Sequence, residues 1–83
     1  MASLRKTLDV ILSGRSDQNV RFPDLCRVLF AMRFARRITG GHHIFSRIGI
    51  DEVINLQPLQ GGKAKAYQVK QVRQIITKYG LSV

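Results

Sequence analysis

A pair of glycines, Gly40 and Gly41, separates two strand-like runs and limits the possible folds of this chain more than any other feature. Residues 34–39 precede the pair, and residues 42–47 follow it. Glycine adopts positive φ at little cost, so a glycine pair at this point favours a tight strand-to-strand turn. A connection this short leaves no room for a crossover helix, which predicts an antiparallel pair of strands.

A third strand-like run, residues 52–56, follows a turn at residues 48–51. Ile54 and Leu56 lie two positions apart and are the natural inward pair of this run, because side chains alternate between the faces of a strand. Three consecutive strands with short connections favour an antiparallel meander.

Helical periodicity is confined to the two ends of the chain. Ser3 suits the N-cap of a helix over residues 4–13 that Gly14 ends, and a polar loop is expected over residues 15–21. Pro23 suits the first turn of a second helix that runs to Met32. A last helix has an apolar face and stops at Gly80; that face comprises Val69, Val72, Ile75, Ile76 and Tyr79. The order α-α-β-β-β-α predicts one α+β domain, residues 1–83, with a three-stranded antiparallel sheet covered by helices on one face.

Charge is the strongest compositional signal, with 14 Lys and Arg against 5 Asp and Glu, a net charge of +9. Such an excess favours a polyanionic partner, either nucleic acid or an acidic protein surface. The composition alone is explained equally well by a basic surface that contacts only solvent.

No apolar run is long enough to span a membrane, and residues 1–6 lack the hydrophobic region of a signal peptide. The single cysteine, Cys26, has apolar neighbours and is expected to be a buried, reduced thiol. We therefore expect a cytoplasmic protein with no membrane partner.

The two histidines of the chain, His42 and His43, directly follow the glycine pair. Imidazole is the only side chain whose unperturbed pKa, ~6.5, lets it exchange a proton near neutral pH. Adjacent strand residues point to opposite faces, so the two cannot bind one metal ion. One imidazole can instead take the proton from an RNA 2′-hydroxyl, which then attacks the adjacent phosphorus, with no metal or cofactor. The alternative is that one histidine packs at a strand end and the other faces solvent without any chemistry.

Basic side chains offer contacts to phosphate. The second glycine pair, Gly61 and Gly62, does not match a nucleotide-binding fingerprint, but it leads Lys63 and Lys65 to the start of the last helix. A helix N-terminus with lysines suits a phosphate, although an exposed basic loop explains the same residues. The predicted RNA-binding residues are Lys63, Lys65, Lys70, Arg73, Arg36 and Arg37.

Residues 22–47 resemble the HicA family of toxins from bacterial and archaeal toxin–antitoxin systems. The resemblance rests on the helix that ends at Met32, on Phe34, on the basic strand and on Gly-Gly-His-His-Ile-Phe at residues 40–45. The family usually has Gly-Ser-His here, so Gly41 replaces its serine, and Arg33 stands where glycine is usual. The resemblance covers most of residues 20–81, and residues 1–14 form an extra N-terminal helix.

The resemblance implies a fold like that of the double-stranded-RNA-binding domain and metal-independent, ribosome-independent cleavage of mRNA in a stress response. It places the catalytic histidine at His42, supported by the turn at Gly40 and Gly41. It also implies a HicB-like antitoxin, expected to be acidic, that covers this histidine. The alternative from another class is a non-catalytic module that binds duplex RNA by shape, which the lysines at residues 63 and 65 would also suit.

Overall fold

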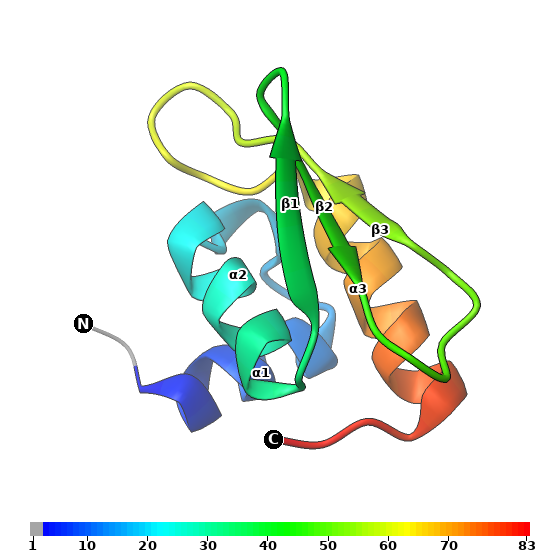
Figure 1. Cartoon of the computed structure of the whole chain (residues 1–83). Coiled ribbons are helices and arrows are strands. Elements are labelled where there is room, and N and C mark those ends of the chain that lie inside the picture. The colour runs from blue at the N-terminus through cyan, green and yellow to red at the C-terminus, as the bar shows by residue number, and fades with distance from the viewer. Residues whose placement is uncertain (1–2) are drawn as a thin grey trace.

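The structure, a computed structural model, describes residues 3–83 and has the element order predicted from the sequence. Three α-helices and three antiparallel strands confirm the α+β class (Figure 1). The elements are α1 (Leu4–Ser13), a 3₁₀ turn η1 (Asp17–Asn19), α2 (Phe22–Ala31), β1 (Ala35–Thr39), β2 (His42–Ser46), β3 (Ile54–Leu56) and α3 (Ala66–Tyr79). Both α2 and α3 lie behind the same face of the sheet, and α1 packs against these two helices. None of the helices described is long and apolar enough to cross a membrane.

The glycine pair forms the turn between β1 and β2, as predicted. Thr39 pairs with His42 across the turn, which leaves Gly40 and Gly41 as its two central residues. Their φ values are +54° and +85°, the combination of the type I′ turn that suits the twist of a hairpin. Among residues 3–83, nothing lies within 4 Å of a Cβ placed at either position, so the positive φ rather than crowding favours glycine.

The sheet has the order β1-β2-β3, and its two faces differ in chemistry. Phe45, Ile54 and Leu56 are fully buried on the face that contacts the helices. Directly paired residues of antiparallel strands lie on the same face. His42 and its partner Thr39 are therefore on the outer face, and His43 is on the inner face with Phe45.

A single hydrophobic cluster joins the apolar faces of the helices to the inner face of the sheet. Cys26 is part of this cluster and is a buried free thiol, which confirms the expected environment. Burial raises the pKa of the Cys26 thiol despite the opposing effect of Arg36. The thiol is therefore held in its less reactive protonated form.

The turn that follows helix α2 contains a strained residue. The Arg33 N–H donates to the Phe30 carbonyl at 2.9 Å, and the Phe34 N–H donates to the Leu29 carbonyl at 3.0 Å. These two bonds define a Schellman motif, whose turning residue is usually glycine in the left-handed region. Here that residue is Arg33, with φ of +70°. A glycine at this position would adopt the same φ without strain.

Most expected boundaries agree with the observed ones to within one residue, and two regions differ more. Strand β3 begins at Ile54 rather than at residue 52. The Glu52 carboxylate instead accepts hydrogen bonds from Lys78 Nζ at 3.0 Å and Tyr79 Oη at 3.1 Å, which draws the chain toward α3. The loop expected at residues 15–21 contains the 3₁₀ turn η1.

Candidate functional site around His42

His42 is an exposed residue at the start of β2, on the outer face of the sheet. Its Nδ1 lies 3.1 Å from Oδ1 of Asn55 on β3. A carbonyl oxygen can only accept a hydrogen bond, so this contact requires the proton of the neutral ring to be on Nδ1. The lone pair is then on Nε2, which can accept a proton. The contact thus orients the ring and selects its tautomer.

Asn55 is itself held through its backbone. Gln68 Nε2 donates to the Asn55 carbonyl at 3.3 Å, and Gln68 Oε1 accepts from the Gln57 N–H at 3.1 Å. Gln68 is only 5% exposed, so its amide connects the end of β3 to the start of α3 from a buried position. This connection fixes the strand that carries Asn55, and so the partner of His42.

A shallow pocket of about 270 Å³ opens beside His42. Tyr67 and Gln71 come from the first turns of α3, and Val53 precedes β3. The full lining is His42, Val53, Asn55, Gln57, Tyr67, Gln68 and Gln71. Amides dominate this lining, which offers hydrogen-bond donors and acceptors without a fixed charge.

His43 has the opposite environment. Its ring packs edge-on against Phe22, with the ring centroids 4.8 Å apart. Its Nδ1 is buried and has no hydrogen-bond partner within the part of the chain described. Burial lowers the pKa of His43, and the nearby positive charge of Arg36 lowers it further. The ring is therefore held neutral. It lies on the inner face, opposite to His42, and strand alternation predicted that the two histidines point to opposite faces.

One packed histidine and one exposed histidine are also what the alternative without chemistry predicts. The contact of His42 with Asn55 and the adjoining pocket are features that this alternative does not require. Across residues 3–83, no group of three or more His, Cys, Asp and Glu side chains gathers in a way that could hold a metal ion.

The predicted lysines lie around the start of α3. Lys65 is the N-cap residue of α3, and its Nζ donates to Gln57 Oε1 at 3.2 Å, at the edge of the pocket. Lys63 is exposed on the preceding loop, which the bonds from the Phe22 N–H to the Gly62 carbonyl (2.8 Å) and from the Ala64 N–H to the Val20 carbonyl (2.9 Å) tie to the start of α2. The third lysine is exposed on α3, at residue 70.

The two strand arginines are on different faces of the sheet. Arg37 pairs with Ile44 and is exposed on the outer face, which it shares with His42. Arg36 pairs with Phe45 on the inner face, and its guanidinium lies 4.9 Å from the centre of the Phe30 ring. Only Arg37 can therefore belong to the same surface as His42.

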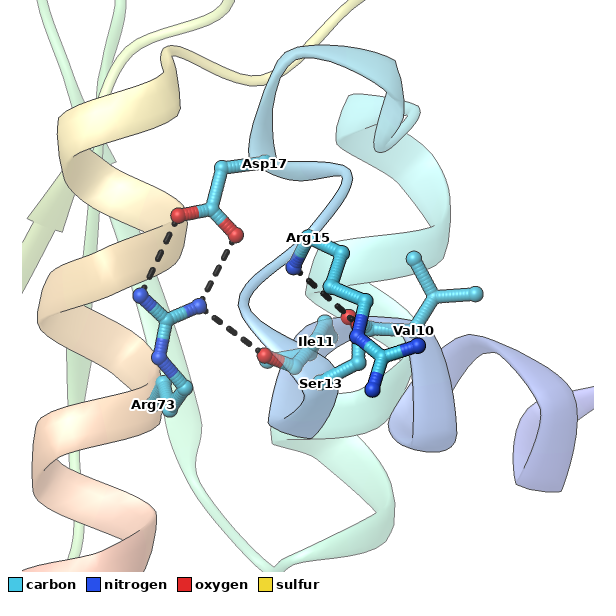
Figure 2. Close-up of polar contacts among 6 residues, drawn as sticks. All are labelled: Val10, Ile11, Ser13, Arg15, Asp17 and Arg73. Atoms are coloured by element: carbon cyan, nitrogen blue, oxygen red, sulfur yellow. Dashed lines mark hydrogen bonds and ion pairs between the residues drawn. The ribbon is translucent and has the colours of Figure 1, made fainter.

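Arg73 is engaged within the fold (Figure 2). Its Nη1 and Nη2 donate to the two carboxylate oxygens of Asp17 at 2.8 and 3.1 Å, and Nη1 also donates to the Ile11 carbonyl at 3.0 Å. The hydrogen bonds to Asp17 raise the pKa of Arg73. The side chain thereby joins α3 to η1 and to the end of α1. This arrangement does not support the prediction that Arg73 binds phosphate, and we leave it out of the proposed site.

Sequence reasoning missed Asn55, Tyr67 and Gln68. A polar residue between Ile54 and Leu56 is the one usable signal, because alternation directs Asn55 to the outer face. Gln68 gives no such signal, since an isolated glutamine on a helix is usually exposed.

Comparison of the chain with protein-family models, with curated proteins and with solved structures found no match in any of the three. The α+β class therefore rests on the structure itself.

Proposed function

We propose that this chain is an endoribonuclease, a HicA-type toxin that cleaves mRNA with His42 as its general acid/base. The observation that carries the proposal is the contact between His42 Nδ1 and Asn55 Oδ1 at 3.1 Å. It leaves Nε2 as the proton acceptor of an exposed ring beside a pocket. The HicA-like pattern at residues 40–45 assigns the same histidine independently of this contact.

The reaction follows from what one imidazole can do. Nε2 takes the proton of a ribose 2′-hydroxyl, and the 2′-oxygen attacks the adjacent phosphorus. The bond from phosphorus to the 5′-oxygen breaks, and that oxygen takes up a proton from the imidazolium. The products are a 2′,3′-cyclic phosphate and a 5′-hydroxyl. A positioned general base contributes ~10²–10⁴-fold to such a rate.

Positive charge around the pocket would stabilise the negatively charged transition state. The side chain of Lys65, the N-cap residue of α3, makes no capping hydrogen bond to the helix, and an uncapped helix N-terminus suits an anion. Lys65 lies at the same helix start and at the edge of the pocket. Lys63, Lys70 and Arg37 are further exposed cations, which we assign to contacts with the phosphates of the RNA backbone.

The net charge of +9 also supports an acidic partner. A HicB-like antitoxin of net negative charge would be attracted to the lysines and would inhibit the toxin by covering His42. Co-purification with the product of the neighbouring gene, followed by hydrogen exchange, tests this. We expect protection over residues 40–43 and 63–66, and protection confined to α1 would contradict inhibition by covering.

The second candidate is a non-catalytic module that binds duplex RNA. The observation in its favour is the pair Lys63 and Lys65, placed before a helix in a fold of order α-β-β-β-α. Phosphate contacts from such a site would need no histidine.

Expression in a bacterial host tests the proposal against this candidate. The unmodified chain should arrest growth, and His42→Ala should abolish the arrest while the protein accumulates in folded form. Ile48→Ala is the matched control, because that side chain is fully exposed on a distant turn. Continued arrest by the folded His42→Ala variant would contradict the proposed catalytic role.

A further inference from the structure

We infer that the pocket beside His42 holds one unpaired nucleobase stacked on Tyr67, so that the substrate of this site is single-stranded RNA. The inference rests on the proposed function, because it specifies which form of RNA reaches the histidine. It comes from the lining of the pocket and from Tyr67, which the general acid/base role of His42 does not use.

Tyr67 is exposed and yet held in place. Its side chain is on the first turn of α3, and the residue is 65% exposed. The buried Gln68 amide donates to its hydroxyl oxygen at 3.4 Å. The hydroxyl end of the ring is thus anchored while a large aromatic surface stays open to solvent. Single-stranded RNA is commonly bound by stacking its bases on such aromatic side chains.

The lining of the pocket suits the edge of a base better than a phosphate. Asn55, Gln57 and Gln71 carry amides, each with a donor and an acceptor, which is the pattern that base edges present. No Lys, Arg, Asp or Glu is among the described residues that line the pocket. Lys65, one of the assigned cations, donates a hydrogen bond to Gln57, a residue of the pocket lining. In this arrangement the base enters the pocket, and the phosphate of the same nucleotide stays outside it, beside Lys65.

The volume of the pocket limits the ligand to one ring system. At about 270 Å³, it is smaller than the ~300–1,000 Å³ of pockets that enclose a drug-sized molecule. A base within a duplex is stacked and paired on both sides and cannot enter unless it leaves the helix, which costs energy. The site should therefore prefer single strands to duplexes of the same sequence.

Binding to short 2′-O-methyl RNA tests this inference separately from catalysis. Such RNA has no free 2′-hydroxyl and cannot be cleaved by the proposed reaction, so the dissociation constant is meaningful even if the chain proves inactive. Fluorescence anisotropy would compare the wild type with Tyr67→Ala, Tyr67→Phe and the exposed control Ile48→Ala, after circular dichroism has verified that each is folded.

We expect Tyr67→Ala to bind about 5- to 150-fold more weakly, the loss that corresponds to one stacked base. Tyr67→Phe keeps the stacking ring but loses its hydroxyl anchor, so its affinity should lie between those of Tyr67→Ala and the wild type. Ile48→Ala should match the wild type. An abasic residue moved along the oligonucleotide should weaken wild-type binding at one position and have little further effect on Tyr67→Ala there, because both changes remove the same contact.

Equal affinity of the wild type and folded Tyr67→Ala would overturn the inference. So would equal affinity of the wild type for a single strand and for its duplex. If these binding results hold but no cleavable RNA is cut, the base pocket stands and the proposed nuclease activity fails.

Discussion

Asn55 Oδ1 on β3 lies 3.1 Å from His42 Nδ1 on β2, so the ring of the exposed histidine is oriented by the neighbouring strand. The pairing of β2 with β3 brings the two side chains together on the outer face. Removing the Asn55 amide should let the ring rotate and change its tautomer. Asn55→Leu should lower kcat roughly 10- to 100-fold, a part of the ~10²–10⁴-fold that a positioned base contributes.

If Asn55 acts by positioning the His42 ring, its replacement should affect kcat and RNA binding differently, whereas a loss of folding would reduce both. In Asn55→Leu, kcat should fall more than the affinity for uncleavable RNA, because only one of the amides that line the base pocket is lost while Tyr67, Lys63 and Lys65 are untouched. Asn55→Asp keeps an acceptor for Nδ1 and should retain more of kcat at saturating RNA than Asn55→Leu does. Equal kcat in Asn55→Leu and the wild type would show that the contact has no part in the reaction.

The half-buried ring of His43 should make folding stability depend on pH. Its pKa is lowered in the folded state by burial and by Arg36, so below ~6.5 the unfolded state binds more protons than the folded state. The stabilisation is therefore complete above that pH and is lost as the pH falls toward the lowered pKa. Cys26 also lines the hollow beside this ring, and burial raises the pKa of its thiol, so the thiol stays uncharged in that window.

Urea unfolding measured between about pH 5 and 7.5 tests the role of His43. The free energy of unfolding of the wild type should fall on the acid side of this range. His43→Phe should fall less steeply, because the replacement is a ring that cannot be protonated. Ile48→Ala, which alters an exposed side chain with no ionisable group, should keep the wild-type slope. Identical slopes in wild type and His43→Phe would refute the assignment.

Arg33 should be a site where glycine stabilises the protein. The left-handed conformation, with φ of +70°, costs a non-glycine residue roughly 1–2 kcal/mol, and the greater freedom of glycine in the unfolded chain offsets part of the gain. Arg33→Gly should therefore raise the free energy of unfolding by about 0.5–1 kcal/mol. Arg33→Ala removes the same charge but keeps the strain, and it should give no comparable gain. Destabilisation by Arg33→Gly in urea unfolding would contradict this explanation.

The lysines around α3 should make RNA binding depend on salt. The logarithm of the binding constant should fall with the logarithm of salt concentration by ~0.7–0.9 for each phosphate neutralised. Replacing Lys63, Lys65 or Lys70 by alanine should each lower that slope by close to one unit and leave the free energy of unfolding almost unchanged. Affinity that does not vary between low and physiological salt would reject the electrostatic part of the account.

Arg73→Ala is the matched control on the same helix. It leaves the carboxylate of Asp17 and the carbonyl of Ile11 without their partner, and a partly buried ion pair broken on one side costs on the order of 2–4 kcal/mol. We expect lower stability with an unchanged salt slope. A drop in the slope would return Arg73 to the RNA-binding surface.

Local patterns in the sequence were sufficient to predict most of the fold. The turn at Gly40 and Gly41 and the helix ends at Gly14 and Gly80 depend on residues close in sequence, and all lie where they were predicted. The start of β3 was not predictable in this way, because Glu52 is drawn to α3 by partners 26 and 27 residues away.

The site depends more on distant contacts. Alternation along β2 predicts that His42 and His43 face opposite ways, but not which of them is exposed. The partner of His42 follows from the strand register, which places Asn55 13 residues further along the chain within reach of Nδ1. Helical spacing puts Arg73 on the face away from the core stripe, yet its ion pair comes from Asp17, 56 residues before it.

The products of RNA cleavage test the central claim most directly. A purified chain and a single-stranded RNA, incubated with EDTA and analysed by mass spectrometry, should yield fragments that end in 2′,3′-cyclic phosphate and begin with 5′-hydroxyl. A 2′-deoxy substitution at the cleaved position should block the cut, and His42→Ala should be inactive while the Ile48→Ala control matches the wild type. Undiminished cleavage by a folded His42→Ala variant, or cutting that ignores the 2′-deoxy substitution, would contradict a mechanism in which His42 activates the 2′-hydroxyl.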